Sequence, residues 1–176
     1  LSRSRDEIRA FLDDVGGRAV IKPLDRMGGG GIFMLRHDDP NLATILETVT
    51  RDGAELVTVQ EFLPGARDGD KRILLIDGEP LGAVLRVPQG LDFRGNMAVG
   101  GQAVAADVSE ADLAIVDAVR DRVRAEGLWF VGLDVIGGRL TELNVTSPTG
   151  VQEINRLHGV QIERRVFDWV DAKVAG

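Results

Sequence analysis

The sequence predicts an α+β fold with mostly antiparallel strands. Two aliphatic segments are joined by Asp77-Gly78 and two more by Gly137-Gly138, and both dipeptides are typical of two-residue hairpin turns. Segments with apolar residues at helical spacing lie around these hairpins rather than alternating with single strands. With 176 residues, the chain has the length of one ordinary domain or of two small lobes.

Turn residues and apolar periodicity divide the first third of the chain into five short elements. They are a helix capped at Ser4 and stopped at Gly16-Gly17, strands over 19–21 and 32–35, a helix capped by Asp39-Pro40, and a strand over 56–62. The first helix carries a capping-box pattern, in which Glu7 follows Ser4 by three residues. The run Gly28–Gly31 is too permissive for regular structure, so we expect a loop between the first two strands.

The remainder of the chain predicts two hairpins, a helix between them and a helical C-terminal region. The elements are strands over 72–76 and 81–87, a long loop over 88–101, a helix from Ser109 to Gly127, and strands over 128–136 and 140–145. The helix is expected to face the core with Leu113, Val116, Val119 and Val123, and the C-terminal region with Ile154, Leu157, Ile162, Val166 and Trp169. A loop as long as 88–101 inside a compact domain is often a functional lid.

The composition excludes several classes of function. With 21 Lys+Arg against 28 Asp+Glu, the net charge of -7 disfavours general binding to nucleic acid or to anionic membranes. The absence of cysteine excludes disulfides, thiolate catalysis and thiolate zinc sites, and two histidines are too few for a histidine metal cluster. No apolar run approaches the roughly 20 residues of a membrane helix. We therefore expect a cytoplasmic protein whose chemistry depends on carboxylates, arginine, lysine and glycine loops.

The glycine run and the lysine before it form the first candidate site. Gly28–Gly31 expose several backbone N–H groups, which suit phosphate oxygens, although the spacing matches neither the P-loop nor the dinucleotide fingerprint. Lys22 ends the preceding buried strand, where its ammonium group is placed to meet the same phosphates. The alternatives are a flexible hairpin turn and a lysine that extends to solvent.

Three oxygen donors on the last hairpin, Asp134, Glu142 and Asn144, predict a metal site. Glu142 and Asn144 are two residues apart on one strand and therefore share a face. Two carboxylates and an amide suit Mg²⁺ that is held jointly with nucleotide phosphates. A two-residue Gly137-Gly138 turn would pair Asp134 with Thr141 on the wrong face, so we expect an odd-numbered loop if Asp134 is to face Glu142. The alternative is that these are ordinary polar strand positions.

Arginines near the central hairpin form a third candidate set. Arg72, Arg86 and Arg94 lie on that hairpin or in the loop after it, and each one taken alone is most often a solvated surface charge. Arg94 is the most suggestive, because a lid that closes over a developing anion needs such a donor. The hydroxyl-rich segment 146–149 directly follows the candidate metal ligands and is equally able to cap the last helical region.

Motif-like passages run through most of the chain. They are Val20–Asp25 with Met27–Gly29, Gln60–Pro64, Asp68–Arg72, Val87–Gly90, Arg94–Asn96, Gly100-Gly101, Phe130–Asp134 and Thr141–Thr149. Taken together, from about Ala19 to Ile154, they resemble the ATP-grasp fold, and specifically the family of prokaryotic glutathione synthetases. The chain departs from that family at Arg26, where a glycine is common, and at Gln102, where an arginine is common.

The resemblance implies an ATP site between two lobes, each with an antiparallel sheet. The residues implied for ATP are Lys22 at the phosphates, Gly28, Gly29, Gly30 and Gly31 over them, Gln60, Glu61, Phe62 and Leu63 at the adenine, and Asp70 near the ribose. Those implied for catalysis are Arg72, Arg94 and Asn96, those for the substrate are Arg86, Ser147, Pro148 and Thr149, and those for Mg²⁺ or Mn²⁺ are Asp134, Glu142 and Asn144.

The reaction implied by the resemblance has two steps. The γ-phosphate of ATP moves to the terminal carboxylate of γ-glutamylcysteine, and the amine of glycine then displaces phosphate to give glutathione. The resemblance further implies that residues 1–176 are the C-terminal ATP-grasp portion of a longer enzyme without its amino-terminal substrate domain, that this portion alone is inactive or nearly so, and that the enzyme is a homo-oligomer. Two alternatives are an ATP-grasp ligase for another peptide or amino acid, and a fragment that binds nucleotide without turnover.

Overall fold

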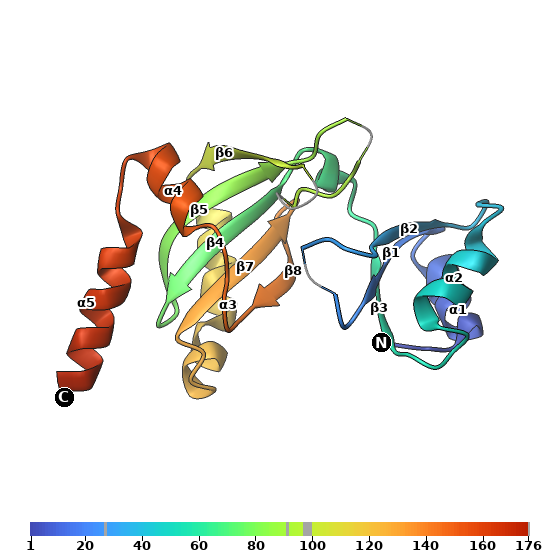
Figure 1. The fold of residues 1–176 in the computed structure, drawn as a ribbon, viewed down its shortest axis with the longest axis horizontal. Helices are drawn as coiled ribbons and strands as arrows, with labels where there is room; N and C mark the ends of the chain where they lie inside the picture. Colours follow the sequence, from blue (N-terminus) through green and yellow to red (C-terminus); the bar gives the residue numbers. More distant parts are fainter. Residues whose placement is uncertain (27, 91, 97–99, 176) are drawn as a thin grey trace. The chain divides into compact units, whose positions relative to one another are not determined.

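The chain folds into two compact units, each with its own antiparallel sheet. The structure, a computed structural model, describes residues 1–26, 28–90, 92–96 and 100–175. The first unit spans Leu1–Pro64 and the second Gly65–Gly176. Every strand pairing within the two sheets is antiparallel, which confirms the predicted α+β class (Figure 1).

The first unit packs two helices on a three-stranded sheet of order β2-β1-β3. Its elements are α1 (Arg5–Asp14), β1 (Arg18–Pro23), β2 (Phe33–Arg36), α2 (Leu42–Thr50) and β3 (Val57–Glu61). One core joins both helices to the sheet, because Ile8 and Leu12 of α1 and Leu46 of α2 pack with Ile21 and the other buried strand residues. The helix periodicity is therefore confirmed, and the strand expected over 19–21 is present as β1.

The helix caps in this unit differ in detail from the prediction. The Ser4 hydroxyl accepts a hydrogen bond from the Glu7 backbone N–H, but the Glu7 carboxylate accepts from Ser2 Oγ at 2.5 Å. The first residue of α2 follows Asn41, whereas Asp39 closes a turn by accepting from the Asn41 N–H at 2.8 Å. Asp39-Pro40 therefore lies just before the helix and does not cap it. Gly28–Gly31 lie in turns, as expected, and Met27 of the same passage is outside the described residues.

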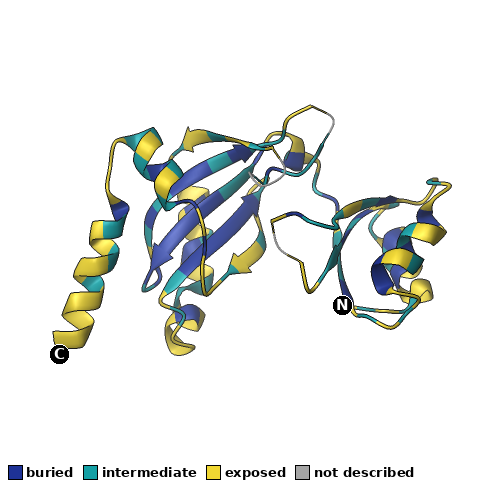
Figure 2. Cartoon of the chain, viewed as in Figure 1, coloured by how far each residue is buried: buried dark blue, intermediate teal, exposed yellow. Residues whose placement is uncertain are grey.

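The second unit is built on a five-stranded sheet of order β6-β5-β4-β7-β8. After a short 3₁₀ helix, η1 (Pro64–Arg67), its elements are β4 (Asp70–Ile76), β5 (Glu79–Val87), β6 (Gln102–Ala106), α3 (Glu110–Ala125), β7 (Phe130–Ile136), β8 (Arg139–Asn144), α4 (Val151–His158) and α5 (Ile162–Ala175). The central strands β4 and β7 are the most buried part of this sheet (Figure 2).

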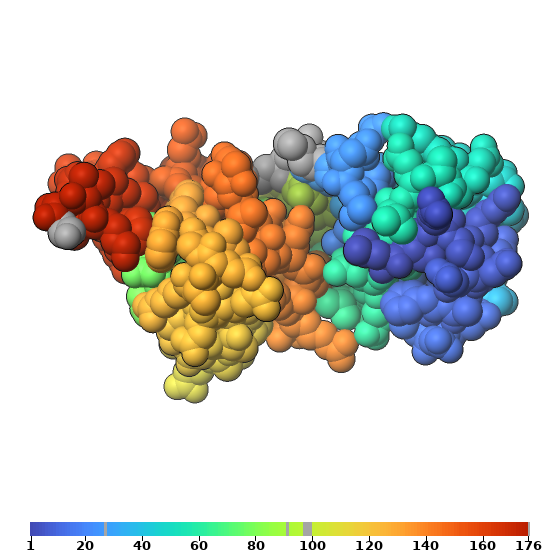
Figure 3. Space-filling model, turned by 90° about the horizontal axis from the view of Figure 1, so that it is seen from below, coloured from blue at the N-terminus to red at the C-terminus, as the bar shows by residue number. Residues whose placement is uncertain are grey.

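The two faces of this sheet have separate cores. On one face, Val116 and Val123 of α3 pack with Ile73, Leu75 and other strand residues. On the opposite face, Ile154 of α4 and Ile162 of α5 pack with Leu74 and Ile76 of β4. The strand residues alternate between the two cores because successive side chains of a strand point to opposite faces. Ile162 is the only buried residue of α5 among those described, and this helix shows clearly on the surface, in red, in Figure 3.

One strand of this unit was not predicted, and one prediction about its helix is wrong. Strand β6 lies inside a region that the sequence left unassigned, because Gln102–Ala106 is alanine-rich, lies at an edge of the sheet and shows no alternation of burial. Leu113 was expected to face the core, but it is 39% exposed. The neighbouring Asp112 is buried instead, where it accepts hydrogen bonds from Lys71 Nζ at 2.7 Å and from the Ser109 N–H at 2.8 Å.

Both hairpins combine a two-residue turn with one extra residue in the second strand. In β4–β5, Ile76 pairs with Glu79 across Asp77-Gly78, and the register shifts so that Leu81 is the extra residue. In β7–β8, Ile136 pairs with Arg139 across Gly137-Gly138, and Thr141 is the extra residue. All four turn residues have positive φ, as the tight turns of twisted hairpins require. Such bulges change the face on which every later side chain of the strand lies.

Candidate active site

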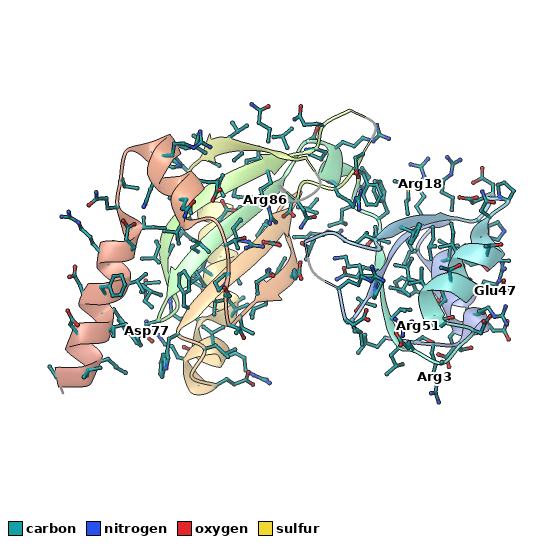
Figure 4. The ribbon with its side chains drawn as sticks, in the orientation of Figure 1. Arg3, Arg18, Glu47, Arg51, Asp77 and Arg86 are labelled. Atoms are coloured by element: carbon teal, nitrogen blue, oxygen red, sulfur yellow. The ribbon has the colours of Figure 1, made fainter. Side chains whose placement is uncertain are left out.

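Charged residues occupy one end of the sheet face that α4 covers at its other end. Arg72 lies two residues before the buried Leu74 on β4, and Asp134 lies two residues after Gly132 on β7, so both share the face of Leu74. Arg86 lies on the same face, because its register partner is Asp70 and because Val84, two residues before it, belongs to the α4 core. Figure 4 labels Arg86 and, at the opposite end of the strands, Asp77.

Asp134 is the centre of this charged cluster. Its carboxylate accepts two hydrogen bonds from Arg72, one from Nε and one from Nη2 at 3.0 Å, which is the two-point geometry of a guanidinium with a carboxylate. Its Oδ2 also lies 2.9 Å from Nη2 of Arg86. Arg72 and Arg86 are 6% and 4% exposed, which rules out the alternative that these two arginines are solvated surface charges.

Arg86 joins a second carboxylate to the cluster. Its Nη2 donates to Oδ2 of Asp70 at 2.5 Å, so one nitrogen bridges Asp70 and Asp134. The other oxygen of Asp70, Oδ1, is buried and has no hydrogen-bond partner within the described part of the chain. A buried oxygen without a donor is costly, and it marks a position where a ligand donor would be accepted.

The pKa values of the two aspartates move in opposite directions. Burial and the neighbouring charge of Asp134 raise the pKa of Asp70 to about 6. Burial also acts to raise the pKa of Asp134, but the hydrogen bonds from Arg72 and the charges of both arginines outweigh it and hold that pKa below its ordinary range. Asp134 is therefore the ionised member of the pair across the whole neutral range.

Stability should depend on pH through Asp70. Between its ordinary pKa of 3.8 and the folded value of about 6, the folded chain holds a proton that the unfolded chain has lost, so this contribution to stability falls as pH rises through that window. Asp70→Asn cannot titrate. Urea denaturation should therefore show that the unfolding free energy of the variant, minus that of the wild type, is larger at pH 7 than at pH 4.5. A difference that is constant or falls with pH would contradict the raised pKa.

The bulge at Thr141 brings Glu142 to Asp134. The turn has two residues, yet Asp134 pairs with Glu142, so the expectation that this pairing needs an odd-numbered loop is wrong. The Thr141 hydroxyl donates to the Asp134 carbonyl at 3.1 Å, which fixes the bulge. Spacing alone would place Leu140 on the face of Glu142, but Leu140 pairs with Val135 of the α3 core and so lies on the other face. Asn144 follows on the face of Glu142 and donates to the Gly132 carbonyl at 3.4 Å.

The donors of the predicted metal site lie on one face of β7 and β8. Glu142 is exposed, Asn144 is partly buried, and Asp134 is already held by the two arginines. Within the described residues, no group of three or more His, Asp or Glu side chains is placed to hold a metal ion. Two carboxylates and an amide fit an ion that takes its remaining ligands from water or phosphate, as Mg²⁺ does, and they do not fit a site made of protein ligands alone.

The segment after β8 passes directly over Arg72. Nη1 of Arg72 donates a hydrogen bond to the Thr149 carbonyl at 3.0 Å. Pro148 is buried, and a Cβ added to Gly132 would lie 2.9 Å from Pro148 Cβ and 3.1 Å from Arg72 Cδ. Glycine at position 132 is therefore what allows this segment and Arg72 to approach β7. Ser147 is exposed, and its N–H donates to the Val145 carbonyl at 2.8 Å.

Residues 92–96 of the predicted lid rest against the same cluster. A Cβ added to the buried Gly95 would lie 2.5 Å from the Arg86 carbonyl oxygen and 3.2 Å from Asp70 Cβ, so the backbone of the loop packs tightly there. Arg94 forms an ion pair with Asp92, whose role the sequence analysis missed. The signal for Asp92 was its position two residues before Arg94. The remaining lid residues 91 and 97–99 lie outside the described part of the chain.

The candidate ATP residues of the first unit gather on two neighbouring strands and the glycine turn. Lys22 on β1 pairs with Thr58 on β3, and Gln60 pairs with Val20. Phe62 is 8% exposed, and its N–H donates to the Arg18 carbonyl at 3.2 Å. Glu61 is exposed, Leu63 is partly buried, and Gly29 is the buried member of the glycine turn.

The fold, with one antiparallel sheet in each unit, is that of the ATP-grasp class of proteins. The fold is shared with the ATP-grasp ligase PsnB complexed with minimal precursor, Mg and ADP, at 22% identity and a TM-score of 0.69 over 99% of this chain and 52% of that one. It is shared as well with D-alanine–D-alanine ligase from Bacillus anthracis, at 18% identity and a TM-score of 0.64 over 100% and 62%.

The sequence places the chain within that class. Residues 1–159 match the family described as prokaryotic glutathione synthetase, ATP-grasp domain, and the chain belongs to this family. A glutathione synthetase from Synechococcus elongatus is 52% identical over 174 residues, which are 99% of this chain and 54% of that protein. The chain thus spans about half the length of the curated relatives it matches. Among the described residues, no helix is long and apolar enough to cross a bilayer.

Proposed function

We propose that this chain is the ATP-grasp portion of a glutathione synthetase, which joins γ-glutamylcysteine to glycine at the expense of ATP. The observation that carries the proposal is the cluster in which Arg72 and Arg86 hold Asp134 opposite Glu142. Its support from comparison is the family match and the name of the relatives. A carboxylate is a poor acylating agent, and transfer of the γ-phosphoryl group to it supplies a leaving group that the amine can displace.

The second unit is proposed to handle the transferring phosphoryl group. Phosphoryl transfer depends on positioning and on charge neutralisation more than on a strong base. Arg72 and Arg94 would stabilise the charge on the phosphoryl oxygens, with Arg86 close to the acceptor carboxylate. When bound, Mg²⁺ or Mn²⁺ would neutralise the nucleotide phosphates, held by Asp134, Glu142 and Asn144. Asn96 and the segment Ser147, Pro148 and Thr149 would line the acceptor side.

The first unit is proposed to supply most ATP contacts. Lys22 and the N–H groups of Gly28, Gly29, Gly30 and Gly31 would bind the phosphates, and the backbone of Gln60, Glu61, Phe62 and Leu63 would bind adenine. Asp70, at the start of the second unit, has a buried acceptor oxygen that suits a ribose hydroxyl. An acyl phosphate needs protection from water, and the loop over 88–101 is proposed as the lid that provides it.

The complete reaction is proposed for the longer protein, with residues 1–176 as its ATP-grasp domain. We expect this chain alone to bind nucleotide with little or no turnover. A second candidate, an ATP-grasp ligase for another peptide or amino acid, is favoured by Gln102, which leaves the end of the lid without the positive charge common in the family. Profiling amine acceptors on the longer protein separates the two. A cytoplasmic location and a homo-oligomeric state are further parts of the proposal.

Calorimetric titration of this chain with ADP, with and without Mg²⁺, tests the proposal. The wild type should bind ADP more tightly with Mg²⁺, and Glu142→Ala with Asn144→Ala should lose at least tenfold in affinity in Mg²⁺ while keeping its affinity without the ion. Asp121→Ala, which removes an exposed acid from α3, is the control and should bind like the wild type. A folded wild-type chain that does not bind ADP, or binds it regardless of metal, would overturn the proposal.

A further inference from the structure

The carboxylate of Asp92 accepts hydrogen bonds from both the side chain and the backbone of Arg94. Oδ1 of Asp92 accepts from the Arg94 backbone N–H at 3.0 Å and from its Nε at 3.0 Å. Oδ2 accepts from Nη2 at 2.6 Å. One carboxylate therefore fixes both the local backbone of the loop and the plane of the guanidinium.

The surroundings of this pair separate it from an ordinary surface ion pair. The side chains of Arg94 and Asp92 are 25% and 30% exposed. The chain contains a second pair of the same two-point form, Arg36 with Asp38, at 52% and 71% exposure. An exposed pair contributes little, because solvent screens it and because both side chains lose freedom. The more enclosed Asp92–Arg94 pair holds its guanidinium in a more restricted place.

The next residue anchors this pair to the charged cluster. Gly95 is buried, and an added Cβ would lie 2.5 Å from the Arg86 carbonyl oxygen. The backbone directly after Arg94 therefore packs closely against Arg86 and Asp70, and Arg94 projects from a loop that rests on the charged cluster. A guanidinium carries its five N–H donors in a rigid fork, and a carboxylate on one edge sets the direction of the others.

Asp92 stays ionised throughout the pH range in which an enzyme of this kind works. Hydrogen bonds from the side chain and the backbone of Arg94 lower the pKa of Asp92 to about 2. Asp92 is thus ionised whenever Arg94 is charged, and because the two charges neutralise each other, orientation is the contribution that Asp92 makes.

We infer that Asp92 is a positioning residue that orients Arg94 toward the γ-phosphoryl group of a bound nucleoside triphosphate. The inference rests on the proposed function, in which Arg94 contacts that group. Asp92 itself touches neither nucleotide nor substrate. Its effect should therefore appear in the preference for a triphosphate over a diphosphate, and not in nucleotide affinity as such.

Calorimetry with two nucleotides in Mg²⁺, ADP and the non-hydrolysable ATP analogue AMPPNP, tests this inference on residues 1–176. The measured quantity is the ratio of the two affinities. Asp92→Asn keeps an acceptor for the Arg94 N–H but loses the charged two-point contact, and it should lower the AMPPNP preference about tenfold while ADP affinity stays within twofold. Asp92→Glu restores a carboxylate and should recover most of the preference. Asp38→Asn breaks the matched exposed pair and should leave both affinities unchanged.

The outcomes separate this inference from the proposed function. If the wild type binds ADP with Mg²⁺ and prefers AMPPNP, but Asp92→Asn retains that preference, the positioning role is overturned and the proposed function stands. Equal losses for both nucleotides in Asp92→Asn and in Asp92→Glu show a structural role only, and they overturn it as well. A folded wild type that binds neither nucleotide overturns both.

Discussion

Replacement of Asp134 by asparagine should reduce the free energy of unfolding by about 3–5 kcal/mol, which is the usual cost of removing one partner from a buried ion pair. Asp134 is 2% exposed and is shared by two buried guanidiniums. In the variant, Arg72 retains the Thr149 carbonyl and Arg86 retains Asp70, but two positive charges then face a neutral amide. Asparagine has nearly the same shape, so the loss measures charge and not a cavity.

Urea denaturation at pH 7 measures this effect. Asp121→Asn removes the same charge from the exposed surface of α3 and should change the unfolding free energy by less than about 0.5 kcal/mol. A loss below about 1 kcal/mol for Asp134→Asn would contradict the buried cluster. The triple replacement of Arg72, Arg86 and Asp134 by apolar residues of similar volume should recover part of the lost stability. It removes both unpaired guanidiniums, and Asp70 is then the one member of the cluster that stays charged without a partner.

Replacement of Gly132 by valine is the second large effect. A Cβ at this position would already lie 2.9 Å from Pro148 Cβ, within a rigid ring, and 3.1 Å from Arg72 Cδ. Inserting carbons into a packed site costs about 1–3 kcal/mol, and the two further methyl groups of valine place the loss at the upper end of that range. Valine is otherwise more favourable than glycine in a strand, so a loss of stability at this position is the opposite of what strand propensity predicts.

Thermal or urea unfolding checks the second prediction, with Gly82→Ala beside Gly132→Ala as the matched pair. At Gly82 the added Cβ would lie within 3.3 Å of one atom only, Ile154 Cγ2 at 2.9 Å, whereas at Gly132 it would lie that close to Pro148 Cβ and to two atoms of Arg72. Gly82→Ala should therefore lose less stability than Gly132→Ala, and it should leave ADP binding unchanged. If valine at position 132 is neutral or stabilising, the close packing of Pro148 and Arg72 on β7 is contradicted.

Much of the fold could be predicted because its signals are local. The helix capped at Ser4, the Asp77-Gly78 turn and the helix that starts at Ser109 each depend on residues a few positions apart, and each is confirmed. Asp134 does pair with Glu142, as the candidate metal site requires, but the bulge at Thr141 brings the two residues together and not an odd-numbered loop. The resemblance to the ATP-grasp family was also confirmed, because it rested on many spaced passages.

What the sequence could not show depends on distant partners. Arg72 and Arg86 have the flanking residues of ordinary polar strand positions, and only the adjacency of β5, β4 and β7 buries them with Asp134. Strand β6 exists because β5 offers an edge to pair with, and its own five residues carry little preference. The site roles assigned to individual residues stay predictions.

In both hairpins, the turn residues and the extra residue, Leu81 or Thr141, add up to an odd number, and this number decides which face of the sheet the later side chains occupy. A two-residue turn plus one bulge has the same parity as a three-residue turn without a bulge, so each arrangement delivers Glu142 to Asp134. A single insertion or deletion in the Gly137-Gly138 turn alone would exchange the charged and apolar faces of β8, whereas a second one at the bulge would restore them. Among natural or designed variants of this domain, the length of the turn and the presence of the bulge should therefore change together. An insertion or deletion of one residue in only one of the two places should be selected against.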